Sequence, residues 1–180
     1  MLLRKINAGL SLLTTVLLLD HAMFLSVWML SRCSIEKSAN TLPRFMMVAM
    51  VIHALLSIVL AILGHKGAKK VKVNTYSKLN IQTNIQRATG ILMLLLIGLH
   101  IAGAMNHFQP KMLHAALHPV FFAVALAHIA VSTSKSLITL GIGNAKLIKI
   151  VDVVMKAICI TTFIAAVVGF YLCLFVGVAR

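Results

Sequence analysis

Five apolar stretches, each long enough to cross a lipid bilayer, constrain this chain more than any other feature of its sequence. They cover about 8–31, 44–64, 85–105, 115–139 and 147–178. A helix needs roughly 20 apolar residues to cross the hydrocarbon core. Hydrophobic residues make up 61% of the 180 residues, more than a soluble domain of this size can bury. We therefore predict an all-α integral membrane protein with five transmembrane helices and one domain spanning 1–180.

The amino-terminal stretch has some features of a signal peptide, because Arg4 and Lys5 precede an apolar run. That run continues to about Leu30, and no small-residue cleavage site follows it. We therefore expect a first helix that is retained.

Positive charge is distributed unevenly between the two ends of the predicted spans. The chain has 17 Lys and Arg against three acids, and its formal net charge is +14. Most of the cations fall at the amino terminus, between the second and third spans, and between the fourth and fifth: Arg4, Lys5, Lys66, Lys69, Lys70, Lys72, Lys78, Arg87, Lys135, Lys146 and Lys149. Fewer fall at the opposite ends: Arg32, Lys37, Arg44, Lys111 and Arg180. The positive-inside rule therefore predicts a cytoplasmic amino terminus.

The basic loop HKGAKKVKVNTYSKLNIQT, between the second and third spans, has two interpretations. It is either a docking surface for a cytoplasmic partner or a stretch that only satisfies the positive-inside rule. Nucleic acid is not an expected partner, because the cations flank membrane spans and do not line one face of a soluble domain.

Four of the eight histidines lie well inside four successive spans: His21, His53, His100 and His128. An ionisable residue at membrane depth indicates function by default. The remaining four, His65, His107, His114 and His118, lie near span ends, where a histidine needs no special role. A single histidine inside a span could be explained by a buried hydrogen bond. Four histidines, each in a different helix, are harder to explain in this way.

The depths of these histidines indicate which of them act together. At 1.5 Å per residue, His21 and His100 lie roughly 20 Å from the inner ends of their helices, and His53 and His128 roughly 16 Å. Neighbouring helices are about 8–10 Å apart, too close to hold a metal and a macrocycle between two imidazoles. Diagonal helices leave more room. We therefore predict two iron-ligand pairs, His21/His100 and His53/His128, each holding one haem.

Zinc fits this pattern poorly. It prefers a compact tetrahedral cluster, often with cysteine or carboxylate ligands. The cysteines Cys33, Cys159 and Cys173 have no paired spacing, which also argues against a disulfide framework.

Small residues near the predicted ligands would make room for a macrocycle. Gly98 and Gly103 flank His100, and Gly90 lies three turns earlier. Ordinary helix packing in membranes also uses small residues, so both explanations stay open.

Two cations are candidate partners for the haem propionates. Lys135 lies seven residues after His128, on the same helix face and two turns toward the cytoplasm. Arg87 lies at the inner end of the third span. The alternative for each is a side chain that extends to the lipid headgroups.

The third span resembles a known helix. The stretch QRATGILMLLLIGLHI, followed by NHFQP, resembles the third helix of the dihaem cytochrome b subunit of succinate:quinone oxidoreductases, the succinate dehydrogenase and fumarate reductase family. The matching positions are Gln86, Thr89, Gly90, His100, Gln109 and Pro110. LLLDHAMFLSVWML, VIHALLSIVL and FAVALAHIAVSTSKSLITLG resemble the other three ligand helices. The likeness covers the first four spans.

The resemblance implies a four-helix haem-binding bundle and a function. In this family the first helix pairs with the third and the second with the fourth. The chain would be the anchor subunit, without the flavin, of a succinate dehydrogenase or fumarate reductase in a prokaryotic inner membrane. It would carry electrons through two haems b between membrane quinone, with menaquinone favoured, and a cytoplasmic iron–sulphur subunit and flavoprotein. The motif also implies that Gln86 lies beside a cofactor.

The route for protons is less well defined by the resemblance. Some dihaem members carry a glutamate two residues before the fourth ligand, where this chain has Leu126. A carboxylate in the loop after the first helix serves quinol oxidation in others, and Glu36 is the candidate here. Asp20, directly before His21, is the acid inside the first span. Neither acid is assigned a catalytic role.

Several other functions remain open. The chain could be the haem b anchor of a hydrogenase or formate dehydrogenase, or its flavoprotein partner could act on another substrate. It could instead be a small haem-free transporter or an assembly protein, whose histidines relay protons or bind a transition metal.

Overall fold

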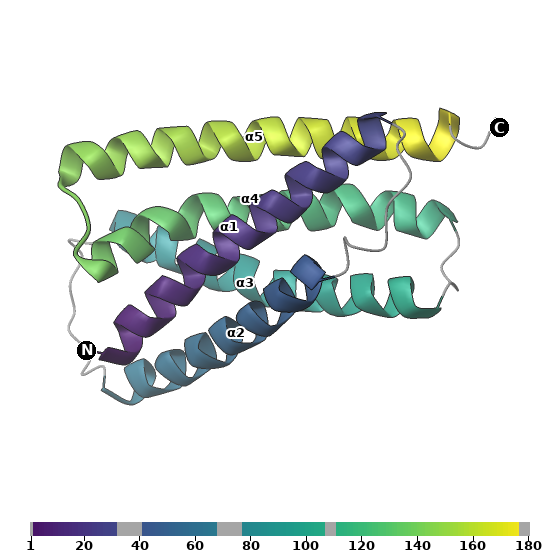
Figure 1. Ribbon diagram of the computed structural model, residues 1–180. Helices are drawn as coiled ribbons and strands as arrows, with labels where there is room; N and C mark the ends of the chain where they lie inside the picture. The colour runs from purple at the N-terminus through teal and green to yellow at the C-terminus, as the bar shows by residue number, and fades with distance from the viewer. Residues whose placement is uncertain (1, 32–40, 68–76, 107–110, 177–180) are drawn as a thin grey trace.

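The chain forms five α-helices in the computed structural model, which describes residues 2–31, 41–67, 77–106 and 111–176 (Figure 1). The helices are α1 (Leu2–Ser31), α2 (Thr41–Gly67), α3 (Ser77–Asn106), α4 (Lys111–Leu140) and α5 (Ala145–Val176). Successive helices run in opposite directions along the bundle (Figure 1). No strand occurs in these ranges, so the all-α prediction is confirmed.

Four helices contain stretches that are long and apolar enough to cross a membrane. These stretches are Leu2–Phe24, Arg44–Leu63, Leu117–Leu140 and Ala145–Leu172. In α3 the corresponding stretch among the described side chains, Thr83–Leu99, is shorter. The predicted multi-pass membrane protein is therefore confirmed, while the third span stays a prediction.

Large apolar side chains cover the outside of the bundle. Phe45 is 71% exposed and Val16 is 64% exposed, and similar residues lie along every helix. Soluble proteins rarely expose apolar surface on this scale. In a bilayer the same surface contacts lipid tails, and helices satisfy their backbone hydrogen bonds internally.

The turn between α4 and α5 depends on two glycines in the left-handed region. Gly141 and Gly143 have φ angles of 78° and 93°. Gly141 N–H donates to Ile138 C=O at 3.1 Å and Ile142 N–H donates to Leu137 C=O at 3.0 Å, the two bonds of a Schellman motif. The Asn144 side chain then caps α5 through the Leu147 N–H at 2.9 Å. This turn places α5 antiparallel to α4.

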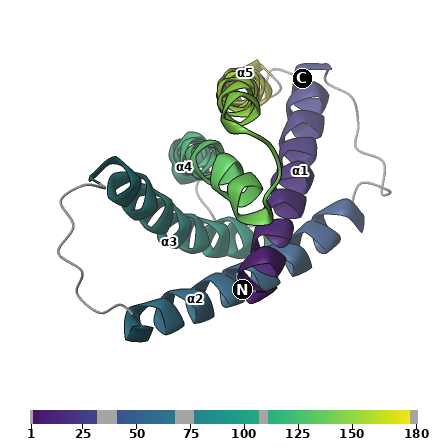
Figure 2. The same ribbon diagram turned by 90° about the vertical axis from the view of Figure 1, so that its left-hand side faces the viewer.

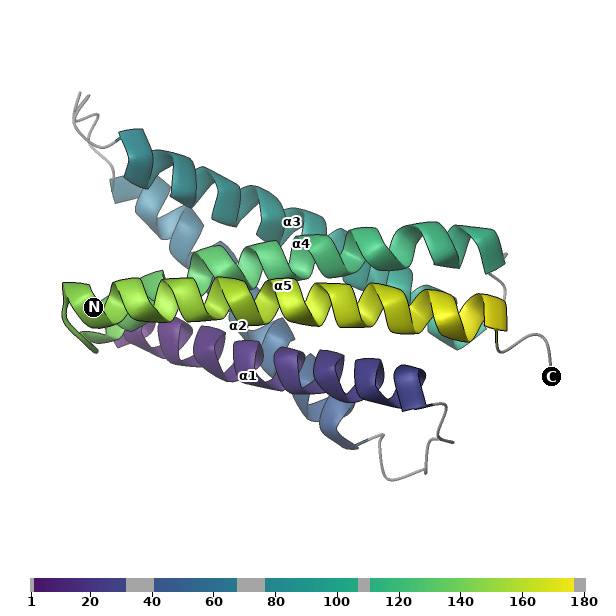
Figure 3. The ribbon, with the colours of Figure 1, turned by 90° about the horizontal axis from the view of Figure 1, so that it is seen from above.

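The helices α1, α4 and α5 pack against one another, while α2 packs on α1 and α3 packs on α4 (Figures 2 and 3). Among the described residues, α1 and α3 make no close backbone contact, and neither do α2 and α4. The helices of each predicted histidine pair are therefore not direct neighbours along their described backbones. In a closed four-helix ring α2 and α3 would be neighbours, but they diverge here (Figure 2) and their described residues make no close backbone contact.

The core lies where α1, α4 and α5 meet. It consists of Ala22, Phe122, Leu126, Ile129, Cys159 and Ala166. Hydroxyl residues also lie buried at these interfaces, and several donate to a carbonyl of their own helix, as Ser26 does to Ala22 at 2.6 Å and Thr133 to Ile129 at 2.8 Å. Small and hydroxyl side chains let helices approach closely in a membrane. The other two helices pack on the outside of this three-helix core, α2 against α1 and α3 against α4.

Candidate cofactor site

His128 on α4 faces α3 and is held there by two consecutive residues. Its Nδ1 lies 3.0 Å from Thr89 Oγ1. Gly90 lies against the same ring, since a Cβ added there would be 3.2 Å from His128 Cε1 and 3.6 Å from Nδ1. The backbone of Gln86 is a further hydrogen-bonding neighbour of the imidazole. The Thr-Gly pair of the sequence motif is therefore part of the His128 environment.

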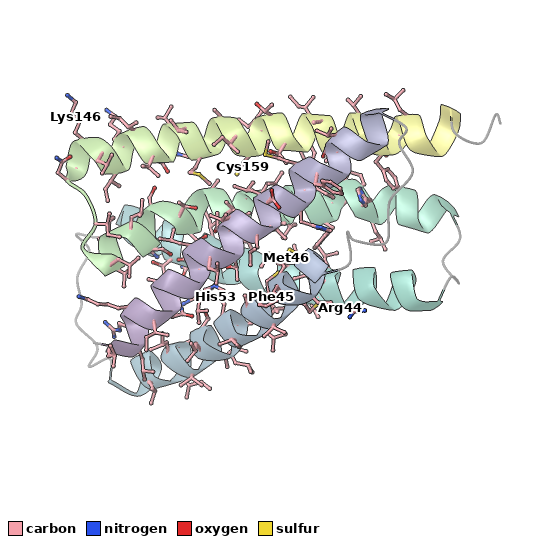
Figure 4. All side chains as sticks on the ribbon, in the orientation of Figure 1. Arg44, Phe45, Met46, His53, Lys146 and Cys159 are labelled. Carbon is pink, nitrogen blue, oxygen red and sulfur yellow. The ribbon has the colours of Figure 1, made fainter. Side chains whose placement is uncertain are left out.

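His53 occupies a half-buried position on α2 (Figure 4). Its Nδ1 is buried and has no hydrogen-bond partner in the part of the chain that the structure describes. One turn further, Ser57 and Asn7 of α1 exchange hydrogen bonds of 3.1 and 3.4 Å. The backbone of Asn7 also lies beside the His53 ring. These contacts attach α2 to α1 at the level of His53.

The predicted partners His53 and His128 lie near one another. They come from α2 and α4, whose described residues make no close backbone contact, yet the two imidazoles are close enough for their charges to interact. The His53 ring lies beside the backbone of Asn7 on α1, and the His128 ring contacts Thr89 on α3. The His53/His128 pairing stays a prediction.

A polar cluster lies between α3 and α4 on the amino-terminal side of α3. Lys135 Nζ donates to Thr83 Oγ1 at 2.7 Å and to Gln86 Oε1 at 3.1 Å. Arg87 is exposed and close enough to Lys135 for their charges to interact. The three predicted residues Gln86, Arg87 and Lys135 thus gather within one region, next to the His128 contacts.

The second predicted pair is described only in part. His21 is half-buried on α1, and Asp20 beside it is exposed. His100 and Gly103 lie in α3, but their side-chain surroundings fall outside the described residues, and Glu36 falls outside them entirely. At Gly98 an added Cβ would meet no atom within 4 Å. The His21/His100 pair stays a prediction.

One histidine that was expected to have no special role is buried in the bundle. His118 is only 7% exposed. Its ring stacks on Phe170 of α5 with centroids 4.1 Å apart, and lies 4.8 Å from Phe122. The four-residue spacing to Phe122 indicates a shared helix face. The contact between His118 and Phe170, by contrast, could not be predicted from the sequence.

An ion pair at the α4–α5 interface was also not predicted. Asp152 on α5 pairs with Lys156 one turn later. Ser134 Oγ of α4 donates to the same carboxylate at 3.4 Å. The pair neutralises an acid in a membrane-length helix, which makes it tolerable there.

Comparison with protein family models, with curated proteins and with solved structures finds no match for the chain.

Proposed function

We propose that the chain is the membrane-anchor cytochrome b subunit of a succinate:quinone oxidoreductase. It exchanges electrons between a cytoplasmic iron–sulphur and flavoprotein pair and membrane quinone. The observation that carries the proposal is the set of histidines His21, His53, His100 and His128, one in each of α1 to α4. The proximity of His53 and His128, whose charges are close enough to interact, supports it further.

The residues around His53 and His128 fit a haem. Imidazole nitrogens are common axial ligands of haem iron. His53 keeps a buried nitrogen that no described protein group uses, and buried polar atoms normally have a partner. Gly90 leaves room for His128 against α3, since an added Cβ would lie 3.2 Å from the imidazole Cε1. When bound, haems b at the two pairs supply one-electron transfer.

The polar cluster fits the carboxylates that such a cofactor carries. Lysine has three N–H donors, and Lys135 uses two of them on Thr83 and Gln86. A third donor and the neighbouring charge of Arg87 are suited to an anionic group. Lys135 and Arg87 would hold propionates, and Gln86 would orient the lysine.

In the membrane, α3 provides the fifth span and the amino terminus faces the cytoplasm of a prokaryotic cell. The exposed cations Arg4, Lys5, Lys146 and Lys149 support this orientation. Lys146 lies at the end of the bundle that carries the amino terminus (Figure 4). That end would meet the cytoplasmic subunits, because its cations fit an anionic partner surface.

Quinone, with menaquinone favoured, is the proposed electron partner in the membrane. It exchanges two protons with two electrons, so a titratable group must lie near it. Leu126 is buried in the α1–α4–α5 core and offers no carboxylate there. Asp20 and Glu36 are the remaining candidates for this proton exchange.

Purification of the chain with its natural partners tests the proposal. We expect flavin-containing and iron–sulphur subunits to co-purify, and a Soret band that shifts when succinate is added. Co-purification of hydrogenase or formate dehydrogenase catalytic subunits would assign the chain to another oxidoreductase. A colourless protein would contradict the cytochrome assignment and leave the transporter hypothesis.

Replacement of Gly90 by alanine tests the space beside His128. Alanine favours a helix by about 1 kcal/mol over glycine, but its Cβ would lie 3.2 Å from His128 Cε1. We expect a free energy of unfolding within about 1 kcal/mol of the wild-type value. We also expect a lower haem occupancy at the His53/His128 site. Gly9→Ala is the matched control, because an added Cβ there meets nothing within 4 Å. Equal haem occupancy in both variants would show that His128 does not need this clearance.

A further inference from the structure

We propose that Thr89 is a positioning residue: it holds His128 in the tautomer that carries hydrogen on Nδ1 and thereby presents Nε2 as the ligand nitrogen. The identity of the ligand as haem iron rests on the proposed function. The hydrogen bond and the tautomer do not, because they follow from the contacts of Thr89, beside which the Gln86 backbone is a further hydrogen-bonding neighbour of the ring.

The direction of the hydrogen bond follows from the other contacts of the Thr89 hydroxyl. Its Oγ1 lies 2.8 Å from the carbonyl oxygen of Ile85 and 3.2 Å from that of Gln86. A carbonyl oxygen can only accept, and a threonine hydroxyl has one hydrogen. That hydrogen is therefore used within α3, most directly on Ile85. The lone pairs of Oγ1 remain for His128.

His128 must then be the donor across the helix interface. Its Nδ1 lies 3.0 Å from Thr89 Oγ1, a normal distance for an N–H···O bond. In a neutral imidazole only one nitrogen carries hydrogen, so Nε2 keeps a free lone pair. That lone pair is what a metal requires.

The surroundings fix the ring as well as the tautomer. Gly90 leaves room for the imidazole beside α3, since an added Cβ there would lie 3.2 Å from Cε1 and 3.6 Å from Nδ1. Gln86 cannot readily turn its amide toward the ring, because its Oε1 accepts from Lys135 at 3.1 Å. Rotation of the His128 ring away from Thr89 would break the hydrogen bond between them. Ligand histidines are commonly fixed by such a bond on the second nitrogen, which also raises their basicity.

Three variants isolate the hydroxyl. Thr89→Val removes it and keeps the shape of the side chain, while Thr89→Ser restores it with less bulk. Thr161→Val is the matched control: Thr161 also donates to a carbonyl one turn earlier, Ala157 at 3.0 Å, and is exposed on α5 without a histidine. All three keep the α-helical backbone.

For a haem-containing preparation, the readouts are redox titration of each haem and haem transfer to a soluble apo-acceptor. We expect Thr89→Val to move the potential of one haem to a more positive value, because a less basic ligand stabilises ferric iron less. We expect its affinity for that haem to fall by about 10–100-fold. Thr89→Ser should restore both values, and Thr161→Val should change neither. Wild-type potentials and affinities in Thr89→Val would overturn the inference while leaving the cytochrome assignment intact.

If the purified wild-type chain holds no haem, the proposed function fails and the tautomer is measured directly. Histidine-selective 15N labelling in lipid bilayers at about pH 8.5, above the usual histidine pKa of about 6.5, separates protonated from unprotonated ring nitrogens. The His128 signal is assigned from its absence in His128→Phe. We expect hydrogen on Nδ1 in wild type and Thr89→Ser, and a shift toward hydrogen on Nε2 in Thr89→Val. Hydrogen on Nε2 in the wild type would overturn the inference.

Discussion

Replacement of His128 by alanine is expected to lower the haem content of the purified chain from two haems to one. The variant leaves one axial position of a haem without its imidazole, while the other pair keeps both ligands. Pyridine haemochrome absorbance per mole of protein measures the change. His118→Phe is the matched control, because His118 stacks on Phe170 and belongs to neither pair. Its haem content should stay at two.

Double variants test the pairing. His53→Ala combined with His128→Ala should still retain one haem, since both residues belong to the same pair. His21→Ala combined with His128→Ala should retain none, since each change removes a different haem. Loss of both haems from the first combination, or retention of one in the second, would show that the histidines are paired differently.

Replacement of Leu126 by glutamate is expected to destabilise the protein strongly. Leu126 is 5% exposed and packs in the core with Ala22 and Cys159 of the neighbouring helices. A charged residue at the centre of a membrane helix costs about 2.5–3.5 kcal/mol even by insertion measurements. We expect a loss of at least about 3 kcal/mol, seen as a lower thermal unfolding midpoint in detergent and a lower yield from membranes.

Leu126→Met is the control for this substitution, because volume-conserving apolar changes in a core cost less than about 1.5 kcal/mol. If Leu126→Glu matched the stability of Leu126→Met, position 126 would face water or a cofactor. The carboxylate of related dihaem proteins would then have space here, contrary to the packing observed.

The sequence predicted the helices well because each apolar stretch is longer than any core helix of a soluble domain needs to be. It also placed Lys135 and His128 on one face of α4, since seven residues correspond to nearly two helical turns. The diagonal relation of α2 to α4 followed from the alternation of helix directions. These features depend on residues within one helix or on connectivity alone.

The contacts between helices could not be predicted in the same way. Lys135 contacts Thr83 and His118 stacks on Phe170, pairs far apart in the sequence. Which residues meet depends on the tilt and rotation of each helix. In a membrane protein apolar residues surround the whole helix, so periodicity does not reveal the inner face. The described residues of α2 and α3 make no close backbone contact, which depends on the tilt of the two helices and has no signal in the sequence.

The central claim is that paired histidines of this helix bundle bind haem b. The most direct test is the number of haems per chain in wild-type protein purified from its own membranes, with protein quantified by amino-acid analysis. We predict two haems b, both low-spin and reducible by dithionite. A wild-type chain that carries no haem would contradict it.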